Sequence, residues 1–182
     1  VDPVHHRTTE LCERYWQPRP GGDFALAMAT ARLVFEREHV HPDAHTWCDH
    51  LDDFKALAMS KTVTAWCAEA DVSEDAASDL ATRLHDGPTT ILVGWGLGRR
   101  LNGAGIVRAL DALGAITGNV GVPGGGVSFY FKRRAAFDTR FVRGLEVAPR
   151  SIAEPLLGPE ILAAKDPPIR AVWITAGNPV AM

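Results

Sequence analysis

The sequence predicts an α/β fold in which a parallel sheet carries helices on both faces. Two short apolar runs, residues 89–93 and 169–174, have the length and the β-branched residues of buried strands. Segments with apolar residues at helical spacing precede and separate them. Because helices that separate short buried strands are typical of parallel sheets, we expect a Rossmann-like arrangement.

The composition is that of a globular protein. Of the 182 residues, 46% are hydrophobic and 23% are charged, and the formal net charge is -3. This charge gives no indication of nucleic-acid binding, and no stretch approaches the roughly 18 apolar residues of a membrane helix. The chain begins at Val1 without a methionine and stops at Met182 just after an expected turn. We therefore interpret it as an internal fragment of a multidomain enzyme.

The first part of the chain is expected to be mainly helical. Val1-Asp2-Pro3 resembles the end of a strand, because Pro3 cannot continue a paired strand. A helix is predicted to begin at Asp23, a good N-cap residue, and to end before Pro42. Residues 45–70 have the pattern of one or two further helices.

The next segment predicts a helix, a strand and a turn in succession. Residues 71–75 supply a capping residue followed by acids, and Gly87-Pro88 closes the helix that begins there. After the strand at 89–93 comes a glycine-rich turn at 94–98. Asn102-Gly103 then caps another helix.

The last third has a weaker pattern. A second glycine-rich loop covers residues 114–126, and a loop-rich excursion follows at 127–158. A short helix is predicted at 159–165, before the strand at 169–174, which ends in Gly177-Asn178-Pro179.

Three of these strand ends are expected to form a ligand site. Ligands of parallel sheets bind beyond the carboxyl ends of the strands, so residues 2–3, 94–98 and 177–179 would share one edge. Glycines in such a turn let backbone amides approach a phosphate, and Arg99 and Arg100 could pair with its oxygens. The alternative is that the glycines only permit tight turns with positive φ, and that the arginines start a solvated helix.

Asp2 and Asp23 are candidate base-binding carboxylates. A carboxylate can accept two parallel hydrogen bonds from the N1–H and N2–H₂ edge of guanine, a pair that adenine cannot donate. Such charge-assisted bonds contribute roughly 1.5–3 kcal/mol each. Trp95 could lie against a planar heterocycle. The structural alternatives are a helix cap at Asp23 and a turn carboxylate at Asp2.

Taken together, the motifs resemble the molybdopterin oxidoreductase family, the enzymes related to dimethyl sulfoxide reductase, formate dehydrogenases and nitrate reductases. The resemblance rests on the Asp2-Pro3-Val4 turn, the Pro20-Gly21-Gly22-Asp23 turn, residues 94–103, residues 115–126 and the Gly-Asn-Pro at 177–179. It implies molybdenum or tungsten held by two molybdopterin guanine dinucleotides. It also implies that the metal ligand, and the cysteines of an iron–sulfur cluster when one is present, lie upstream.

The resemblance assigns cofactor contacts and no catalytic or metal-ligating residue. The contacts to the guanosine end of one dinucleotide would come from Asp2, Pro3, Val4, Gly21, Gly22 and Asp23. Those to the pterin and phosphates would come from Trp95, Gly96 and Arg99. Gly177 and Asn178 would face the other dinucleotide.

The resemblance also divides the chain. Residues 1–103 would end one α/β cofactor-binding domain, and residues 104–182 would belong to a second, related domain. The whole enzyme would move electrons or an oxygen atom to or from a small-molecule substrate, with an electron-transfer partner, whereas this fragment alone would be inactive. We expect neither nucleic-acid binding nor direct membrane insertion.

Two other functions fit parts of the sequence. The turn at 94–98 could serve a nicotinamide-dependent dehydrogenase, although no convincing acidic residue follows a second strand about 20 residues later. The chain could also be a non-catalytic α/β nucleotide-binding module. Preference for guanine over adenine would separate the first hypothesis from the dehydrogenase.

Overall fold

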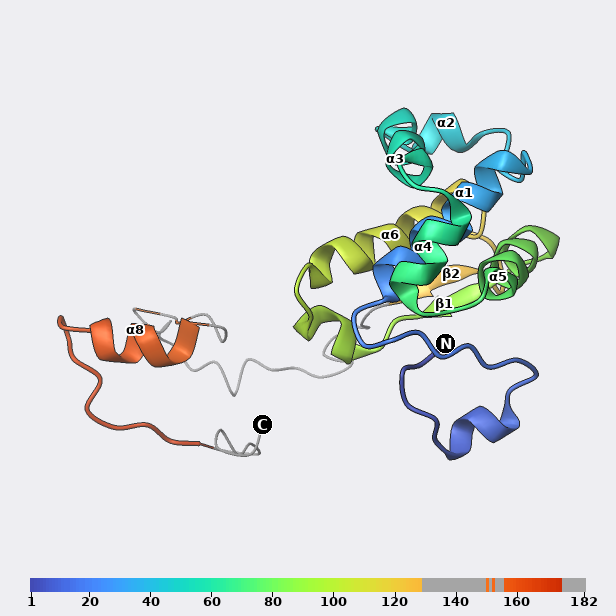
Figure 1. Cartoon of the computed structure of the whole chain (residues 1–182). Coiled ribbons are helices and arrows are strands. Elements are labelled where there is room, and N and C mark those ends of the chain that lie inside the picture. The colour runs from blue at the N-terminus through green and yellow to red at the C-terminus, as the bar shows by residue number, and fades with distance from the viewer. Residues whose placement is uncertain (129–149, 151, 153–155, 175–182) are drawn as a thin grey trace. The chain divides into compact units, whose positions relative to one another are not determined.

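The computed structural model describes residues 1–128, 150, 152 and 156–174. The chain separates into two compact units, Val1–Phe131 and Lys132–Met182, each with its own internal contacts (Figure 1). The assignment of residues 1–103 and 104–182 to two cofactor-binding domains stays a prediction. None of the helices in the described ranges is both long and apolar enough to cross a bilayer.

The central helix of the first unit is α1, Asp23–Glu36. Alanines at several positions of α1 are fully buried, so neighbouring helices can approach its backbone closely, and α3, α4, α5 and α6 all pack against it. The helix was predicted, but Asp23 is not its N-cap. Gly22 occupies that position, Asp23 is the first helical residue, and no side chain caps the helix. The predicted N-cap role of Asp23 is therefore wrong.

Three helices, instead of the predicted one or two, follow over residues 44–70. They are α2 (Ala44–Trp47), α3 (Leu51–Met59) and α4 (Val63–Ala70). His50 adopts the left-handed conformation, with φ 61°, and this separates α2 from α3. Thr62 starts α4, because its side chain accepts a hydrogen bond from the Ala65 N–H at 3.1 Å.

The next helix, α5 (Glu74–Asp86), confirms the helix start predicted at 71–75. Ser73 is its N-cap, and Glu74 and Asp75 place negative charge in the first turn, where the helix dipole favours it. The helix buries Ala76, Ala77, Ala81 and Leu84 against the core.

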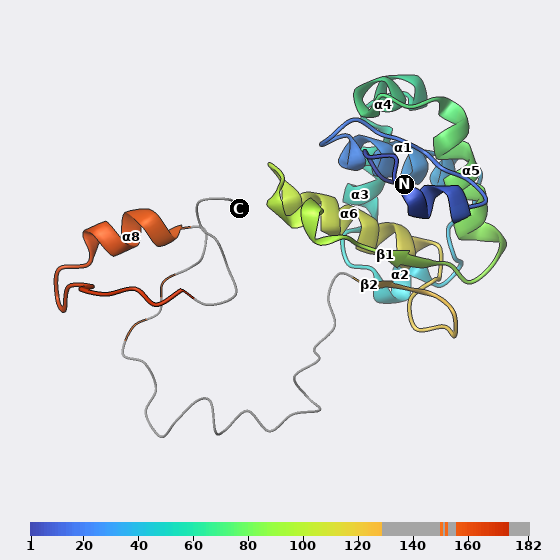
Figure 2. The same cartoon turned by 90° about the horizontal axis from the view of Figure 1, so that it is seen from below.

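A parallel β–α–β unit completes the first unit. The strands β1 (Thr90–Leu92) and β2 (Gly126–Ser128) pair in parallel, with Thr90 opposite Gly126 and Leu92 opposite Ser128. Between them in sequence is α6 (Gly103–Ile116), which contacts both strands (Figure 2). The fold is thus mixed α/β, rich in helix, with a two-stranded parallel sheet in the described residues. The larger Rossmann-like sheet with helices on both faces stays a prediction.

The two strands differ from the predicted ones in position and in burial. The excursion predicted from residue 127 begins too early, because Val127 and Ser128 belong to β2. A three-residue, glycine-led segment shows no alternation, so its strand conformation depends on pairing with β1. Conversely, β1 was predicted to be buried, yet Thr90 and Leu92 are exposed, Leu92 by 79%. Within the described chain β1 pairs only with β2.

Two further expected strand regions are not strands in the structure. Val1–Pro3 is irregular, and it is followed by a short 3₁₀-helix, η1 (Arg7–Leu11).

In the second unit α8 (Leu157–Ala163) corresponds to the helix predicted at 159–165. Residues 169–174, predicted as a buried strand, have no strand conformation, and Trp173 is 90% exposed. An apolar run forms a stable strand only with a paired neighbour, and the described part of this unit supplies none.

Candidate functional site

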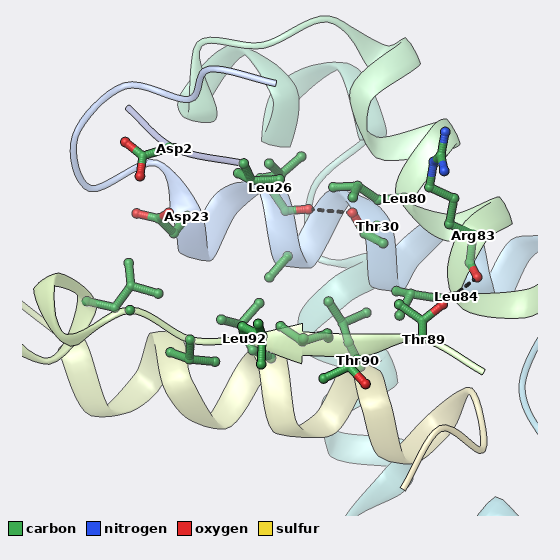
Figure 3. Close-up of a pocket in the computed structure, with 18 of the residues that line it drawn as sticks. Asp2, Asp23, Leu26, Thr30, Leu80, Arg83, Leu84, Thr89, Thr90 and Leu92 are labelled. Carbon is green, nitrogen blue, oxygen red and sulfur yellow. Dashed lines mark hydrogen bonds between the residues drawn. The ribbon is translucent and has the colours of Figure 1, made fainter. Parts of the chain in front are cut away.

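A cavity of about 480 Å³ lies in the first unit between α1, α5, β1 and the segment that leads into α6 (Figure 3). Its walls are mostly aliphatic side chains such as Leu26, Leu80 and Leu84. Asp2 and Asp23 lie at the end of the cavity toward which β1 points (Figure 3). The two carboxylates are therefore grouped beyond the carboxyl end of a parallel strand, where α/β sheets bind ligands.

Asp2 is held in place by the segment that follows it. One carboxylate oxygen, Oδ1, accepts a hydrogen bond from the Val4 N–H at 2.8 Å. The Asp2 N–H donates to the Trp16 carbonyl at 3.2 Å, and the Tyr15 hydroxyl donates to the Asp2 carbonyl at 2.9 Å. These bonds fix the backbone of Asp2. Its second carboxylate oxygen, Oδ2, lies 3.6 Å from His6 Nε2.

Asp23 lies in a mixed electrostatic environment. Asp23 is half-buried, and this burial is the main reason why the pKa of its carboxyl is raised. Asp2 raises this pKa further, whereas the Asp23 N–H and the Arg100 guanidinium lower it. The end of the cavity therefore combines two carboxylates with one guanidinium, and a partner that donates hydrogen bonds would relieve the cost of the half-buried charge.

The glycines that line the cavity have no structural need to be glycine. Gly94 and Gly96 line it, and a Cβ added at either would meet no atom within 4 Å. Neither has a positive φ. The tight-turn alternative therefore does not explain these two positions. Their backbone is open to close approach by a ligand, in the short 3₁₀-helix η2 (Trp95–Arg99) and the residue before it.

The other glycine pair has clear structural causes. Gly21 has φ +88°, which L side chains rarely adopt. A Cβ at Gly22 would stand 2.7 Å from the Ala70 carbonyl oxygen, because the start of α1 presses against the end of α4. Both glycines shape the turn that presents Asp23, and neither lines the cavity.

The structure brings together only part of the predicted site. Of the predicted residues, the cavity lining contains Asp2, Pro3, Asp23 and Gly96. The positions outside the lining are Val4, Gly21, Gly22, Trp95 and Arg99. Trp95 is 62% exposed, beside the cavity in sequence but not in its wall. Gly177 and Asn178 lie outside the described residues.

Two arginines line the cavity, and only Arg100 was considered as a ligand contact from the sequence. Arg100 was paired with Arg99 as a phosphate candidate, and it is Arg100 that the structure places in the lining. Arg83 of α5 lines the opposite end, and no local motif in the sequence marks it (Figure 3). Nowhere in the described ranges do three metal-ligating side chains gather.

No protein-family model matches the chain. It is similar to the "Probable oxidoreductase YyaE" of Bacillus subtilis (strain 168), with 31% identity over 186 residues, 99% of this chain and 28% of that protein. The assimilatory nitrate reductase of Haloferax mediterranei is 33% identical over 127 residues, 69% of this chain and 17% of that protein. The dimethyl sulfoxide reductase DmsA of Haemophilus influenzae is 31% identical over 166 residues, 79% of this chain and 20% of that protein. The chain thus has distant homologues among oxidoreductases, and it spans less than a third of their length.

Proposed function

We propose that this chain is a cofactor-binding part of a molybdenum or tungsten oxidoreductase, and that it holds a molybdopterin guanine dinucleotide. Three of the motifs that resemble the molybdopterin oxidoreductases flank one cavity of the structure. The nitrate and dimethyl sulfoxide reductases among its homologues agree with that resemblance. The observation that carries the proposal is the pair of carboxylates, Asp2 and Asp23, at one end of this cavity.

The acceptors of the cavity match the hydrogen-bond donors of a guanine base. Guanine donates from N1 and N2, and the two aspartates at the cavity end are acceptors. Asp2 Oδ1 already accepts from the Val4 N–H, so Oδ2, which lies 3.6 Å from His6 Nε2, is the oxygen that would accept from a base. Asp23, which is not a helix cap, supplies the second acceptor. Adenine offers no matching pair of donors, so this arrangement disfavours it.

The glycine segment and Arg100 fit the rest of the dinucleotide. Open backbone at Gly94 and Gly96 admits a phosphate or pterin group at close range, and Arg100 balances phosphate charge within the same cavity. Trp95 and Arg99 would face the pterin, and Gly177 and Asn178 a second dinucleotide. When bound, the cofactor supplies the two-electron and oxygen-atom chemistry, whereas the residues of this chain bind and orient it.

The whole enzyme would act on a small molecule and exchange electrons with a redox partner. This chain contributes part of the cofactor scaffold and is inactive alone.

Base preference tests the proposal on the 182-residue chain. We expect GDP to bind at least about tenfold more tightly than ADP, the equivalent of one charge-assisted hydrogen bond. Asp2→Asn and Asp23→Asn should each remove most of this preference in calorimetric titrations. Asp75→Asn, an exposed acid in the first turn of α5, is the matched control and should retain it. Equal affinity for both nucleotides would contradict guanine recognition, and a preference for ADP would in addition favour the nicotinamide alternative.

A further inference from the structure

A polar network from α5 reaches the segment that carries Asp2. Asp79 Oδ2 accepts hydrogen bonds from Trp16 Nε1 at 3.1 Å and from Arg83 Nε at 3.0 Å. Arg83 Nη1 in turn lies 3.3 Å from Glu13 Oε2. Asp79 and Arg83, one turn apart on α5, therefore bind Trp16 and Glu13, more than 60 positions earlier in the chain.

Residues 15–17, next to this contact with α5, also bind the turn at Asp2 and Pro3. The Trp16 carbonyl accepts from the Asp2 N–H at 3.2 Å, and the Tyr15 hydroxyl donates to the Asp2 carbonyl at 2.9 Å. Gln17 Nε2 donates to the Pro3 carbonyl at 3.0 Å. The contacts thus form a chain from α5 through residues 15–17 to Asp2 at the cavity end.

The residues before Trp16 have few other means of attachment. Most residues from Val4 to Arg14 are exposed, and Leu11 exposes 88% of its surface. Trp16 packs against the hydrophobic core and Pro18 is fully buried, so the chain is attached there by apolar contacts as well. The residues before Trp16 have little such burial, so the polar contacts of Glu13, Tyr15 and Trp16 fix the direction in which the chain returns to Asp2. Burial acts to raise the pKa of Asp79, but hydrogen bonds from Trp16 and Arg83 outweigh it and lower this pKa overall. Asp79 is accordingly an ionised acceptor at neutral pH.

We infer that Asp79 is a positioning residue for guanine recognition, because it anchors residues 13–17 and thereby fixes Asp2 at the cavity. The inference rests on the proposed function and adds a determinant of specificity outside the predicted motifs. Asp79 is not in the cavity lining, whereas its partner Arg83 is. Asp79 acts through Trp16 and the backbone of Asp2.

A ligand-free experiment tests the anchor itself. In the 182-residue chain, Asp79→Ala should accelerate tryptic cleavage after Arg14 severalfold while the far-UV circular dichroism stays unchanged. Asp75→Ala, on the exposed first turn of the same helix, is the matched control and should leave the rate unchanged. Trp16→Phe keeps an aromatic ring but removes the Nε1 donor, so it should act in the same direction if Asp79→Ala unfolds. Unchanged cleavage in both variants would overturn the anchor.

A second experiment tests its link to recognition. Asp79→Ala should weaken GDP binding by about tenfold, the effect of losing one charge-assisted bond, and Asp2→Asn should then cause little further loss. Asp79→Asn retains an oxygen acceptor for Trp16 and should restore part of the affinity. Additive losses from Asp79→Ala and Asp2→Asn would overturn the positioning role. A wild-type chain without GDP preference would instead overturn the proposed function, and the cleavage rates would still report on the anchor.

Discussion

Asn119 should be the most sensitive polar residue of the first unit, because its buried side chain joins three segments. Its Oδ1 accepts from the Thr89 N–H at 2.7 Å, just before β1. Its Nδ2 donates to the Leu84 carbonyl of α5 at 2.8 Å and to Thr117 Oγ1 at 2.8 Å. The amide therefore fastens the connection after α6 to the end of α5 and the beginning of β1.

The cost of removing this side chain follows from the groups it would leave behind. Asn119→Ala leaves the Thr89 N–H and the Leu84 carbonyl without these partners, and each buried unpaired group costs about 1–3 kcal/mol. We expect the free energy of unfolding to fall by about 2–6 kcal/mol, a large fraction of the stability of a typical domain. Asn119→Asp keeps an acceptor for Thr89 but loses both donors and sets a carboxylate near the Leu84 carbonyl, so it should be no better tolerated.

Urea denaturation followed by circular dichroism measures this effect directly. Asn102→Asp is the matched control, because Asn102 is exposed, makes no side-chain capping bond and has a left-handed backbone that Asp tolerates. It should change the free energy of unfolding by less than about 0.5 kcal/mol. If Asn119→Ala changed it as little, the hydrogen-bond reasoning for this site would be refuted.

Three further predictions concern the turns and the titratable groups. Gly22→Ala should destabilise the chain by about 1–3 kcal/mol, because its Cβ would stand 2.7 Å from a carbonyl oxygen of α4. Gly96→Ala should change the free energy of unfolding by less than about 0.5 kcal/mol but weaken diphosphate binding. Urea denaturation measures the stability of both variants, and calorimetric titration measures their binding. GDP affinity should fall on acidification at a higher pH than an ordinary aspartate would impose, since burial raises the pKa of Asp23, and Asp23→Asn should abolish this dependence. His39 stacks on His85 with ring centroids 3.7 Å apart, and burial together with the charge of His85 lowers the pKa of His39. The unfolded chain therefore binds more protons than the folded chain once the pH falls below the ordinary pKa of histidine, so stability should decrease on acidification from about pH 7. A pH-independent free energy of unfolding, or an unchanged pH slope in His39→Phe, would contradict this prediction.

Local chemistry explains which elements could be predicted from the sequence. The start of α5 was correct because a capping residue and two acids mark it within five positions. The core of β1 was correct because Ile91 and its neighbours are apolar and bounded by proline and glycine. By contrast β2 depends on a partner 36 positions earlier, and no pattern within Gly126–Ser128 reports that pairing.

The same distinction applies to the site. Asp2 and Asp23 were predicted because turn motifs mark them, and the structure brings both to one cavity, although their role there stays a prediction. The positions of Arg83 and Asp79 follow from packing between α5 and the N-terminal segment, a contact between residues more than 60 positions apart. Residues 169–174 were assigned as a strand from composition alone, and an apolar run cannot by itself supply the neighbour that a strand needs.

Whether this chain belongs to a molybdopterin enzyme can be decided from the metal and nucleotide content of the longest open reading frame that contains it. It should be purified from a host that makes the molybdenum cofactor, with elemental analysis and chromatography of the GMP released by acid. We expect near-stoichiometric molybdenum or tungsten with about two GMP per metal, and a lower GMP content in the Asp2→Asn, Asp23→Asn double variant. Protein that carries neither metal nor GMP from such a host would contradict the proposed function.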